Sequence, residues 1–160
     1  MVTLALASAA IARRLDHARQ PLNDPPTHSC GACCFIVESD FTGTKLENSS
    51  WYRKFIRVHD AQGGDFLVAG SAQLSDNALE EAALTVARMV VMRPDLLSTL
   101  IKENVHLAVM AATEATTDVP EHSYMDADFW DERARGIGAT WSTLTLSCAE
   151  ENLLCDSSDA

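Results

Sequence analysis

The pattern of apolar and polar residues changes near Trp51, where short apolar runs begin to alternate with turn residues. Residues 55–59 (Phe-Ile-Arg-Val-His) and 66–69 (Phe-Leu-Val-Ala) are rich in side chains that favour strands. Residues 60–64 between them hold Asp, Gln and two Gly, a composition typical of a turn. The pattern predicts a β-hairpin. Its second strand has no polar alternation, so we expect that strand to be buried on both faces.

A helical period follows this hairpin. Apolar residues recur every three or four positions from Leu79 to Val90, which predicts an amphipathic helix. Three polar residues at its start offer N-cap side chains: Ser75, Asp76 and Asn77. Asn77 followed by Glu80 resembles a capping box. Pro94 suits the first turn of a second helix, and Asn104 suits its end.

Residues 105–111 read as another buried strand. A strand, two helices and a strand make a crossover unit, so we expect parallel pairing. Residues 126–135 predict a further helix, and the Thr-rich residues 140–148 are β-like. We place Met89, Met92 and Met110 in the core. The fold class is therefore α/β (α+β), with a small mixed sheet that contains a hairpin and a helical crossover.

The same pattern sets the expected domain boundaries. Residues 51–155 form the packed domain, and residues 156–160 form an acidic tail that frays. Residues 1–50 comprise an N-terminal helix from about Val2 to Arg19 and a Pro- and Cys-rich linker, and we expect them to be poorly ordered.

Charge excludes some classes of partner. The chain has 160 residues with 12 Lys and Arg against 23 Asp and Glu, a net charge of −11. Nucleic acid is a poor partner for such a chain, because phosphate binding rests on clustered cations.

No apolar run reaches the about 20 residues of a membrane span. Arg13-Arg14 follows the N-terminal apolar run instead of preceding it, so no clear signal peptide is present and the compartment stays open.

Five cysteines leave the redox state open. Cys30 and Cys33 have the CxxC spacing of a zinc or redox pair, but no second CxxC is present, so we favour thiols without a metal. Cys148 and Cys155 could close a small disulfide loop if the chain is exported.

The densest group of candidate chemistry lies in residues 113–123, directly after the 105–111 strand. Binding groups gather beyond the carboxyl ends of parallel strands. Four residues there could form a metal or acid–base site: Glu114, Asp118, Glu121 and His122. The alternative, which we favour, is a solvated loop with local hydrogen bonds.

Two further pairs are candidates for ligand binding. Arg133 and Arg135 lie at the end of the 126–135 helix, where they suit the helix dipole or could pair with Glu114 or Glu121. We favour structural pairing. Glu150 and Glu151 offer two more carboxylates, which we read as exposed acids at a helix start.

Motifs of known enzymes are absent from these residues. The five histidines form no HExxH, and the sequence holds neither a GxxxxGK[ST] phosphate loop nor a GxSxG nucleophile elbow. We therefore assign no catalytic residue and no metal ligand.

Several longer motifs nevertheless resemble a known family. The shorter matching pieces are Val58-His59-Asp60 with Gly63-Gly64, Arg93-Pro94-Asp95-Leu96 and Leu107-Ala108-Val109-Met110. The more specific pieces are residues 116–122 (Thr-Thr-Asp-Val-Pro-Glu-His), 133–138 (Arg-Ala-Arg-Gly-Ile-Gly) and 147–154 (Ser-Cys-Ala-Glu-Glu-Asn-Leu-Leu). In this order they resemble the N-terminal half of fungal and bacterial zincin-like metallopeptidase domains.

The resemblance implies an incomplete zincin-like domain. In that family a helix bearing HExxH follows the Glu-Asn-Leu-Leu segment, and it supplies zinc ligands and the catalytic Glu. This sequence runs instead from Cys155 into Asp-Ser-Ser-Asp-Ala, so none of those residues can be carried over. The resemblance implies zinc only in full-length relatives, and an extracellular location is compatible with it.

Three functional hypotheses follow. The first is a truncated member of the zincin-like metallopeptidase family, without proteolytic activity by itself. The second is a stand-alone acidic binding domain that uses the 113–123 loop. The third is an enzyme with an unrelated carboxylate site built from Glu114, Asp118, Glu121 and Glu150.

Truncation would also affect association. Loss of a partner half should expose an apolar face, and large exposed patches promote association. We expect self-association or a protein partner at that face.

Overall fold

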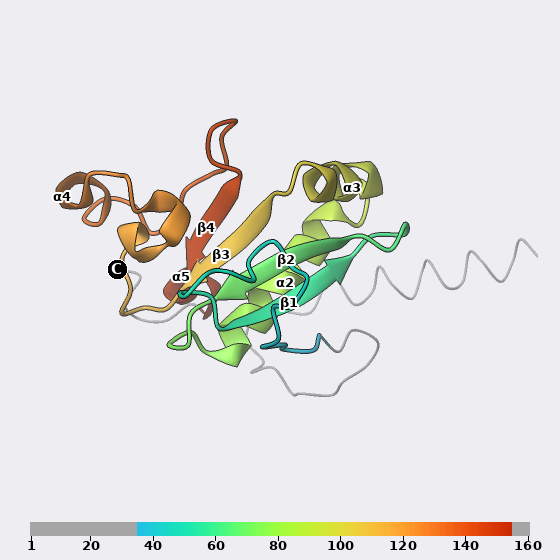
Figure 1. The fold of residues 1–160 in the computed structure, drawn as a ribbon, viewed down its shortest axis with the longest axis horizontal. Helices are drawn as coiled ribbons and strands as arrows, with labels where there is room; N and C mark the ends of the chain where they lie inside the picture. Colours follow the sequence, from blue (N-terminus) through green and yellow to red (C-terminus); the bar gives the residue numbers. More distant parts are fainter. Residues whose placement is uncertain (1–34, 155–160) are drawn as a thin grey trace, which may run out of the picture. The chain divides into compact units, whose positions relative to one another are not determined.

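Four strands form one mixed sheet in the order β1-β2-β3-β4 (Figure 1). The computed structural model describes residues 35–154. The expected N-terminal helix, the linker with Cys30 and Cys33, and the acidic tail lie largely or wholly outside these residues, as does Cys155. The mixed sheet confirms the predicted fold class.

The predicted hairpin is formed by β1 (Lys54–His59) and β2 (Asp65–Gly70), which pair antiparallel. Gly63 in the connecting turn has a φ of +83°, a conformation that glycine adopts without a steric penalty. The Asp60 carboxylate accepts hydrogen bonds from the backbone N–H groups of Gln62 and Gly64 and so closes the turn. Phe66 to Gly70 are all buried, as expected for a strand covered on both faces.

The predicted crossover runs through α2 (Asp76–Val90) and α3 (Pro94–Lys102) into β3 (His106–Met110), which pairs parallel to β2. The N-cap of α2 is Ser75, whose hydroxyl accepts from the Ala78 N–H. The predicted capping box of Asn77 and Glu80 is therefore wrong. Asn104 follows α3 with a φ of 58°, the left-handed conformation that often ends a helix. The strand β4 (Thr145–Ala149) pairs parallel to β3 and leads into α5 (Glu150–Leu154).

The segment between β3 and β4 contains only short helical turns. They are η2 (Thr116–Asp118), η3 (Pro120–His122) and α4 (Ala127–Trp130). The helix predicted over residues 126–135 is therefore wrong after Trp130. Side-chain contacts replace its later turns: the Asp131 carboxylate accepts from the Thr117 N–H and hydroxyl, and Thr116 donates to the Ala134 carbonyl.

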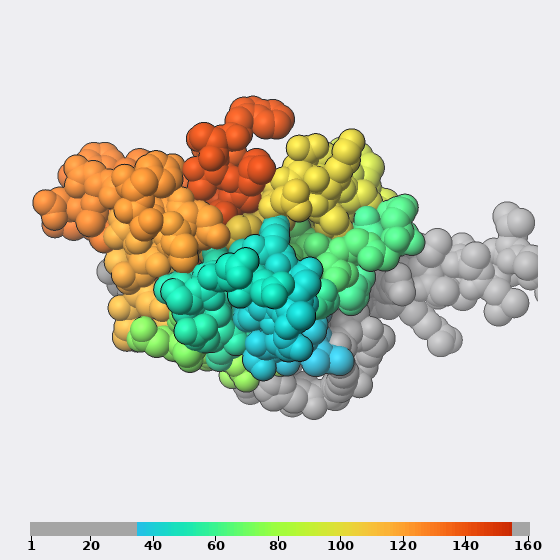
Figure 2. Space-filling model, in the orientation of Figure 1, coloured from blue at the N-terminus to red at the C-terminus, as the bar shows by residue number. Residues whose placement is uncertain are grey.

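The two faces of the sheet are covered differently. The helices α2 and α3 pack on one face, where Ile56, Phe66 and Val68 form the larger apolar cluster. Residues 41–52 and the η2–η3 segment cover the other face, over a smaller cluster that includes Phe55 and Met110. Figure 2 shows this second face, with the 41–52 segment in cyan and the segment after β3 in orange.

Residues 35–50, which the sequence analysis places ahead of the packed domain, pack against it. Leu46 is buried, and Glu38 pairs with Phe55 through two backbone hydrogen bonds. The composition change at Trp51 therefore did not mark the start of the packed domain. Residues 35–50 contain few apolar side chains, but these are enough to pack the segment against the sheet.

Several large apolar side chains face solvent. Met89 and Met92 are 76% and 84% exposed, so placing them in the core was wrong, whereas Met110 is fully buried. With Val91 and Leu96 they form an exposed apolar stretch at the junction of α2 and α3. Self-association through such a face stays a prediction.

Candidate functional site

The polar segment 113–123 divides between the two ends of β3 and β4. Glu114 follows β3 and its carboxylate accepts from the Ala111 N–H at 2.8 Å. Asp118 accepts from the Ala115 N–H at 2.8 Å. Glu121 instead reaches the side chains at the amino ends of the strands. The four candidates of this segment therefore do not form one site.

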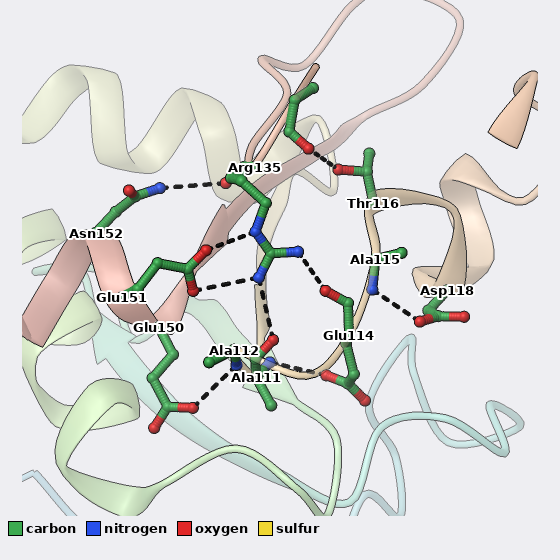
Figure 3. Close-up of polar contacts among 11 residues, drawn as sticks. Ala111, Ala112, Glu114, Ala115, Thr116, Asp118, Arg135, Glu150, Glu151 and Asn152 are labelled. Carbon is green, nitrogen blue, oxygen red and sulfur yellow. Dashed lines mark hydrogen bonds and ion pairs between the residues drawn. The ribbon is translucent and has the colours of Figure 1, made fainter. Parts of the chain in front are cut away.

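Arg135 organises the carboxyl ends of β3 and β4. Its Nε donates to Glu151 Oε1 at 2.5 Å and its Nη2 to Glu151 Oε2 at 3.2 Å (Figure 3). It also donates to the carbonyls of Glu114 and Ala111. We call this set of contacts the Arg135 clasp. A planar guanidinium suits such bidentate pairing.

Glu151 is the buried partner of the clasp, with 7% of its surface exposed. Burial raises the pKa of its carboxyl, but the hydrogen bond and charge of Arg135, together with a backbone hydrogen bond, outweigh this effect, and the pKa lies below its ordinary value. The expectation that Glu151 is an exposed acid was wrong. A buried carboxylate is tolerated here because Arg135 supplies both donors.

Neighbouring side chains extend the clasp. The Glu150 carboxylate accepts from the Ser75 N–H at 3.2 Å and from the Ala112 N–H at 3.3 Å. Asn152 donates to the Arg135 carbonyl at 3.3 Å. These contacts join α5, the start of α2 and the end of β3. Arg135 donates to the backbone carbonyl of Glu114 and forms its ion pair with Glu151. The predicted pairing of Arg135 with the Glu114 or Glu121 carboxylate is therefore wrong.

Arg133 lies outside the clasp. It is exposed, donates to the Phe129 carbonyl at 3.3 Å, and stacks with its guanidinium carbon 4.5 Å from the centre of the Phe129 ring. It pairs with neither Glu114 nor Glu121 among the contacts of the described residues.

Gly136 permits the chain to turn from the clasp onto β4. A Cβ atom at this position would lie 2.7 Å from the Ser147 carbonyl oxygen. The next residue, Ile137, exchanges two backbone hydrogen bonds with Ser147. The glycine is therefore a requirement of close backbone approach, and the Gly-Ile-Gly sequence needs no cofactor to explain it.

A pocket of about 470 Å³ opens at the opposite, amino ends of β3 and β4. Its lining includes Lys45, His106, Glu121, Tyr124, Thr143 and Thr145. We call it the Glu121 pocket. It lies where the 41–52 segment, the η3 region and the loop before β4 come together, the cyan, orange and red parts of Figure 2.

Glu121 is held in this pocket from behind. The buried Tyr52 hydroxyl donates to Glu121 Oε2 at 2.7 Å. His106 Nε2 lies 3.4 Å from Glu121 Oε1 and 3.1 Å from the Tyr52 hydroxyl oxygen. Burial raises the pKa of Glu121, but hydrogen bonds from His106 and Tyr52 outweigh it, so the pKa lies below the ordinary value. Burial and the Glu121 charge raise the pKa of Tyr52, which keeps it protonated.

His122 is fully buried beside this pocket. Its Nε2 lies 3.1 Å from the Ser147 hydroxyl, which also accepts from the Ile137 N–H. Burial lowers the pKa of His122 and favours the neutral ring. Because Ser147 is also buried, no substrate reaches this serine–histidine pair, and we assign it a structural role.

Three residues around Glu121 were not predicted from the sequence. His106 is the one polar residue in the 105–111 run, which could have marked it. Tyr52 adjoins the composition change, and Lys45 lies in the segment assigned to the linker. Only the tertiary structure brings these residues to Glu121.

Neither site shows the donor set of a metal centre. Among residues 35–154, no three His, Cys, Asp or Glu side chains converge as metal ligands would. Burial, together with the Glu151 charge, raises the pKa of the Cys148 thiol to about 12, which makes it a weak nucleophile at neutral pH. Cys155, with which Cys148 could close a disulfide loop in an exported chain, and the CxxC pair lie outside the described residues.

No protein-family model, curated protein or solved structure matches the chain. The resemblance to zincin-like metallopeptidases therefore stays a prediction from the motifs. Within residues 35–154, none of the helices has the length and apolar character needed to cross a bilayer.

Proposed function

We propose that residues 35–154 form the supporting lobe of a zincin-like metallopeptidase domain and have no proteolytic activity by themselves. One observation carries this proposal. The three specific motifs of the resemblance, residues 116–122, 133–138 and 147–154, are far apart in the sequence but contact one another in the fold.

The contacts between these motifs are directional. Thr116 of the first motif donates to Ala134 of the second, and Arg135 of the second pairs with Glu151 of the third. Bidentate, charge-assisted hydrogen bonds fix orientation more tightly than apolar contacts do. The clasp thus sets the direction of α5, the segment that precedes the zinc-binding helix in the family that the motifs resemble.

The chemistry of the clasp supports a positioning role. Glu114 and Glu150 accept hydrogen bonds from backbone N–H groups, and Glu151 accepts from Arg135. The three carboxylates are therefore engaged by donors of the protein itself, and none of them lines the Glu121 pocket. The third hypothesis, an enzyme built on these acids, gains no support because their partners differ and their side chains do not converge.

The second hypothesis, a binding domain, gains support from a separate observation. Glu121 of the 113–123 loop faces an open pocket together with Lys45 and His106. A concave site with a few convergent polar groups is the usual form of a ligand site. A supporting lobe can also carry such a pocket, so the two proposals are compatible.

The intact mass of the native protein from its source tests the first proposal. The 160 residues have a mass of 17.4 kDa. We expect a larger mass, beyond what a glycan adds, and a tryptic peptide that contains HExxH on the C-terminal side of Leu154. A native mass of 17.4 kDa or less would contradict the lobe assignment.

Activity of the 160-residue chain provides the second test. We expect no hydrolysis of a casein or quenched-peptide substrate, with or without added Zn²⁺. Chelator-sensitive hydrolysis by the purified chain, or one zinc per chain after dialysis, would show that the chain has a metal site of its own and would overturn the proposal.

A further inference from the structure

The Glu121 pocket presents two opposite charges to one opening. Lys45 stands at its exposed rim, and the Glu121 side chain, 28% exposed, lines its wall. Desolvation lowers the pKa of Lys45, and the Glu121 charge partly offsets this effect, so the two charges act on each other across the pocket. They form no direct ion pair among the described residues.

Both charges keep hydrogen-bonding capacity. The Lys45 ammonium has three donors and spends one on the Asn104 carbonyl. The Glu121 carboxylate has about four lone-pair positions, of which Tyr52 takes one and His106 lies near another. The remaining donors and lone pairs are available to a molecule in the pocket.

Glu121 is also preorganised. Tyr52 and His106 are 1% and 5% exposed, and both contact the carboxylate from the protein interior. A carboxylate fixed by buried partners loses little freedom when it binds a ligand, which favours affinity. The contacts of Glu121 with Tyr52 and His106 play no part in the Arg135 clasp, because the clasp lies at the opposite ends of β3 and β4.

The rest of the lining is mixed. Leu46 and Leu144 supply apolar surface, and Thr143 and Thr145 supply hydroxyls. Tyr124 is 68% exposed, and its hydroxyl lies 3.1 Å from the Thr143 hydroxyl across the opening. Such a lining suits a small molecule with a charged end and an aliphatic side chain. The volume of about 470 Å³ lies in the range of small-molecule sites.

We propose that the Glu121 pocket binds a small zwitterion, a free amino acid or a dipeptide, with its ammonium group on Glu121 and its carboxylate on Lys45. A purely anionic ligand would meet the Glu121 charge, and a purely cationic ligand would meet Lys45. Only a molecule that carries both charges satisfies both groups. This site is independent of the supporting role proposed for the clasp.

Titration of the ¹⁵N-labelled 160-residue chain, followed by NMR, tests the proposal. The probes are L-leucine and glycyl-L-leucine, each compared with its N-acetyl and its C-amide derivative, which lack one charge. We expect saturable shifts of the backbone amides of Lys45, Glu121 and Thr143 with at least one zwitterion. Each single-charge derivative should bind at least about tenfold more weakly, as loss of one charge-assisted hydrogen bond predicts.

Two variants locate the contacts. Glu121→Gln should weaken binding of the zwitterion by at least about tenfold, and Lys45→Met should do the same from the exposed rim. Since Glu121→Gln also removes the charge that Tyr52 and His106 contact, its folding is checked by circular dichroism. If Glu121→Gln does not fold, Lys45→Met carries the test. Glu81→Gln and Lys102→Met, which change the same charges outside the pocket, should bind like the wild type.

Three results would overturn the proposal. The first is no saturable shift with either zwitterion. The second is equal binding of the zwitterion and its N-acetyl or C-amide derivative. The third is unchanged affinity in the folded Lys45→Met variant.

Discussion

The Arg135 clasp and the Glu121 pocket occupy opposite ends of the same two parallel strands. At the carboxyl ends, Arg135, Glu150 and Glu151 satisfy one another and the backbone. At the amino ends, Glu121 and Lys45 retain free donors and acceptors toward an open cavity. Both regions are rich in charge, so composition alone does not distinguish them.

This difference shows how similar residues take different roles. A charge whose partners lie within the protein contributes to the fold, because removing one partner leaves the other buried and without compensation. A charged group that is fixed by buried partners on one side and faces a cavity on the other can bind a ligand. Substitutions at the two ends of the strands separate these two roles by their effects on stability.

Arg135→Ala should cause the largest loss of stability. The substitution leaves buried Glu151 and two carbonyls without their donor, and breaking a buried pair costs about 3 kcal/mol or more. Urea denaturation measures the free energy of unfolding. Arg135→Lys should lose less free energy of unfolding than Arg135→Ala, since lysine keeps the positive charge but cannot form the bidentate hydrogen bonds of a guanidinium. The matched control is Arg133→Ala, at an exposed site, where at most about 1 kcal/mol is expected. Equal losses at both arginines would remove the distinction between clasp and surface.

Gly136→Ala should be the next most damaging change. Its Cβ would lie 2.7 Å from the Ser147 carbonyl oxygen, which is backbone and cannot move aside. Overpacking of this kind costs about 1–3 kcal/mol. Gly138→Ala is the control, because a Cβ there meets nothing within 4 Å. Chemical denaturation of the two variants compares them directly, and a wild-type midpoint for Gly136→Ala would contradict the close approach.

Stability should fall as the pH decreases from about 7.5 to about 5.5, because His122 is held neutral beside the pocket. Burial places its pKa in the folded state below the ordinary value of 6.5. The unfolded chain therefore binds a proton more readily, and its stability relative to the folded state rises as pH falls through 6.5. Denaturation at several pH values gives the slope. His122→Asn should flatten it, and an unchanged slope in that variant would assign the effect to other groups.

Lys45→Met should have the smallest effect on stability. The residue stands at the exposed rim of the pocket, and surface substitutions of this kind change stability by about 0.5 kcal/mol or less. A thermal melt beside that of Arg135→Ala measures the contrast. A loss as large as that of Arg135→Ala would mean that Lys45 contributes to the fold in the way that Arg135 does.

The sequence determined the local elements of this protein. The hairpin turn at Gly63, the helical period of α2, the Pro94 start of α3 and the parallel crossover were all predicted, because they rest on local propensity and periodicity. The grouping of acids after β3 was also visible in the sequence, as was their favoured role in local hydrogen bonds, which Glu114 and Asp118 make.

Which of these residues contact one another depends on the folded arrangement of distant segments. The separation of Glu121 from Glu114, the burial of Glu151 and the approach of Lys45, Tyr52 and His106 depend on contacts between residues distant in the sequence. The helix predicted to Arg135 ends at Trp130 because Thr116 and Thr117 bind the following residues, which no local pattern encodes. Long-range hydrogen bonds outweigh weak local propensity, and the roles of the charged residues follow from them.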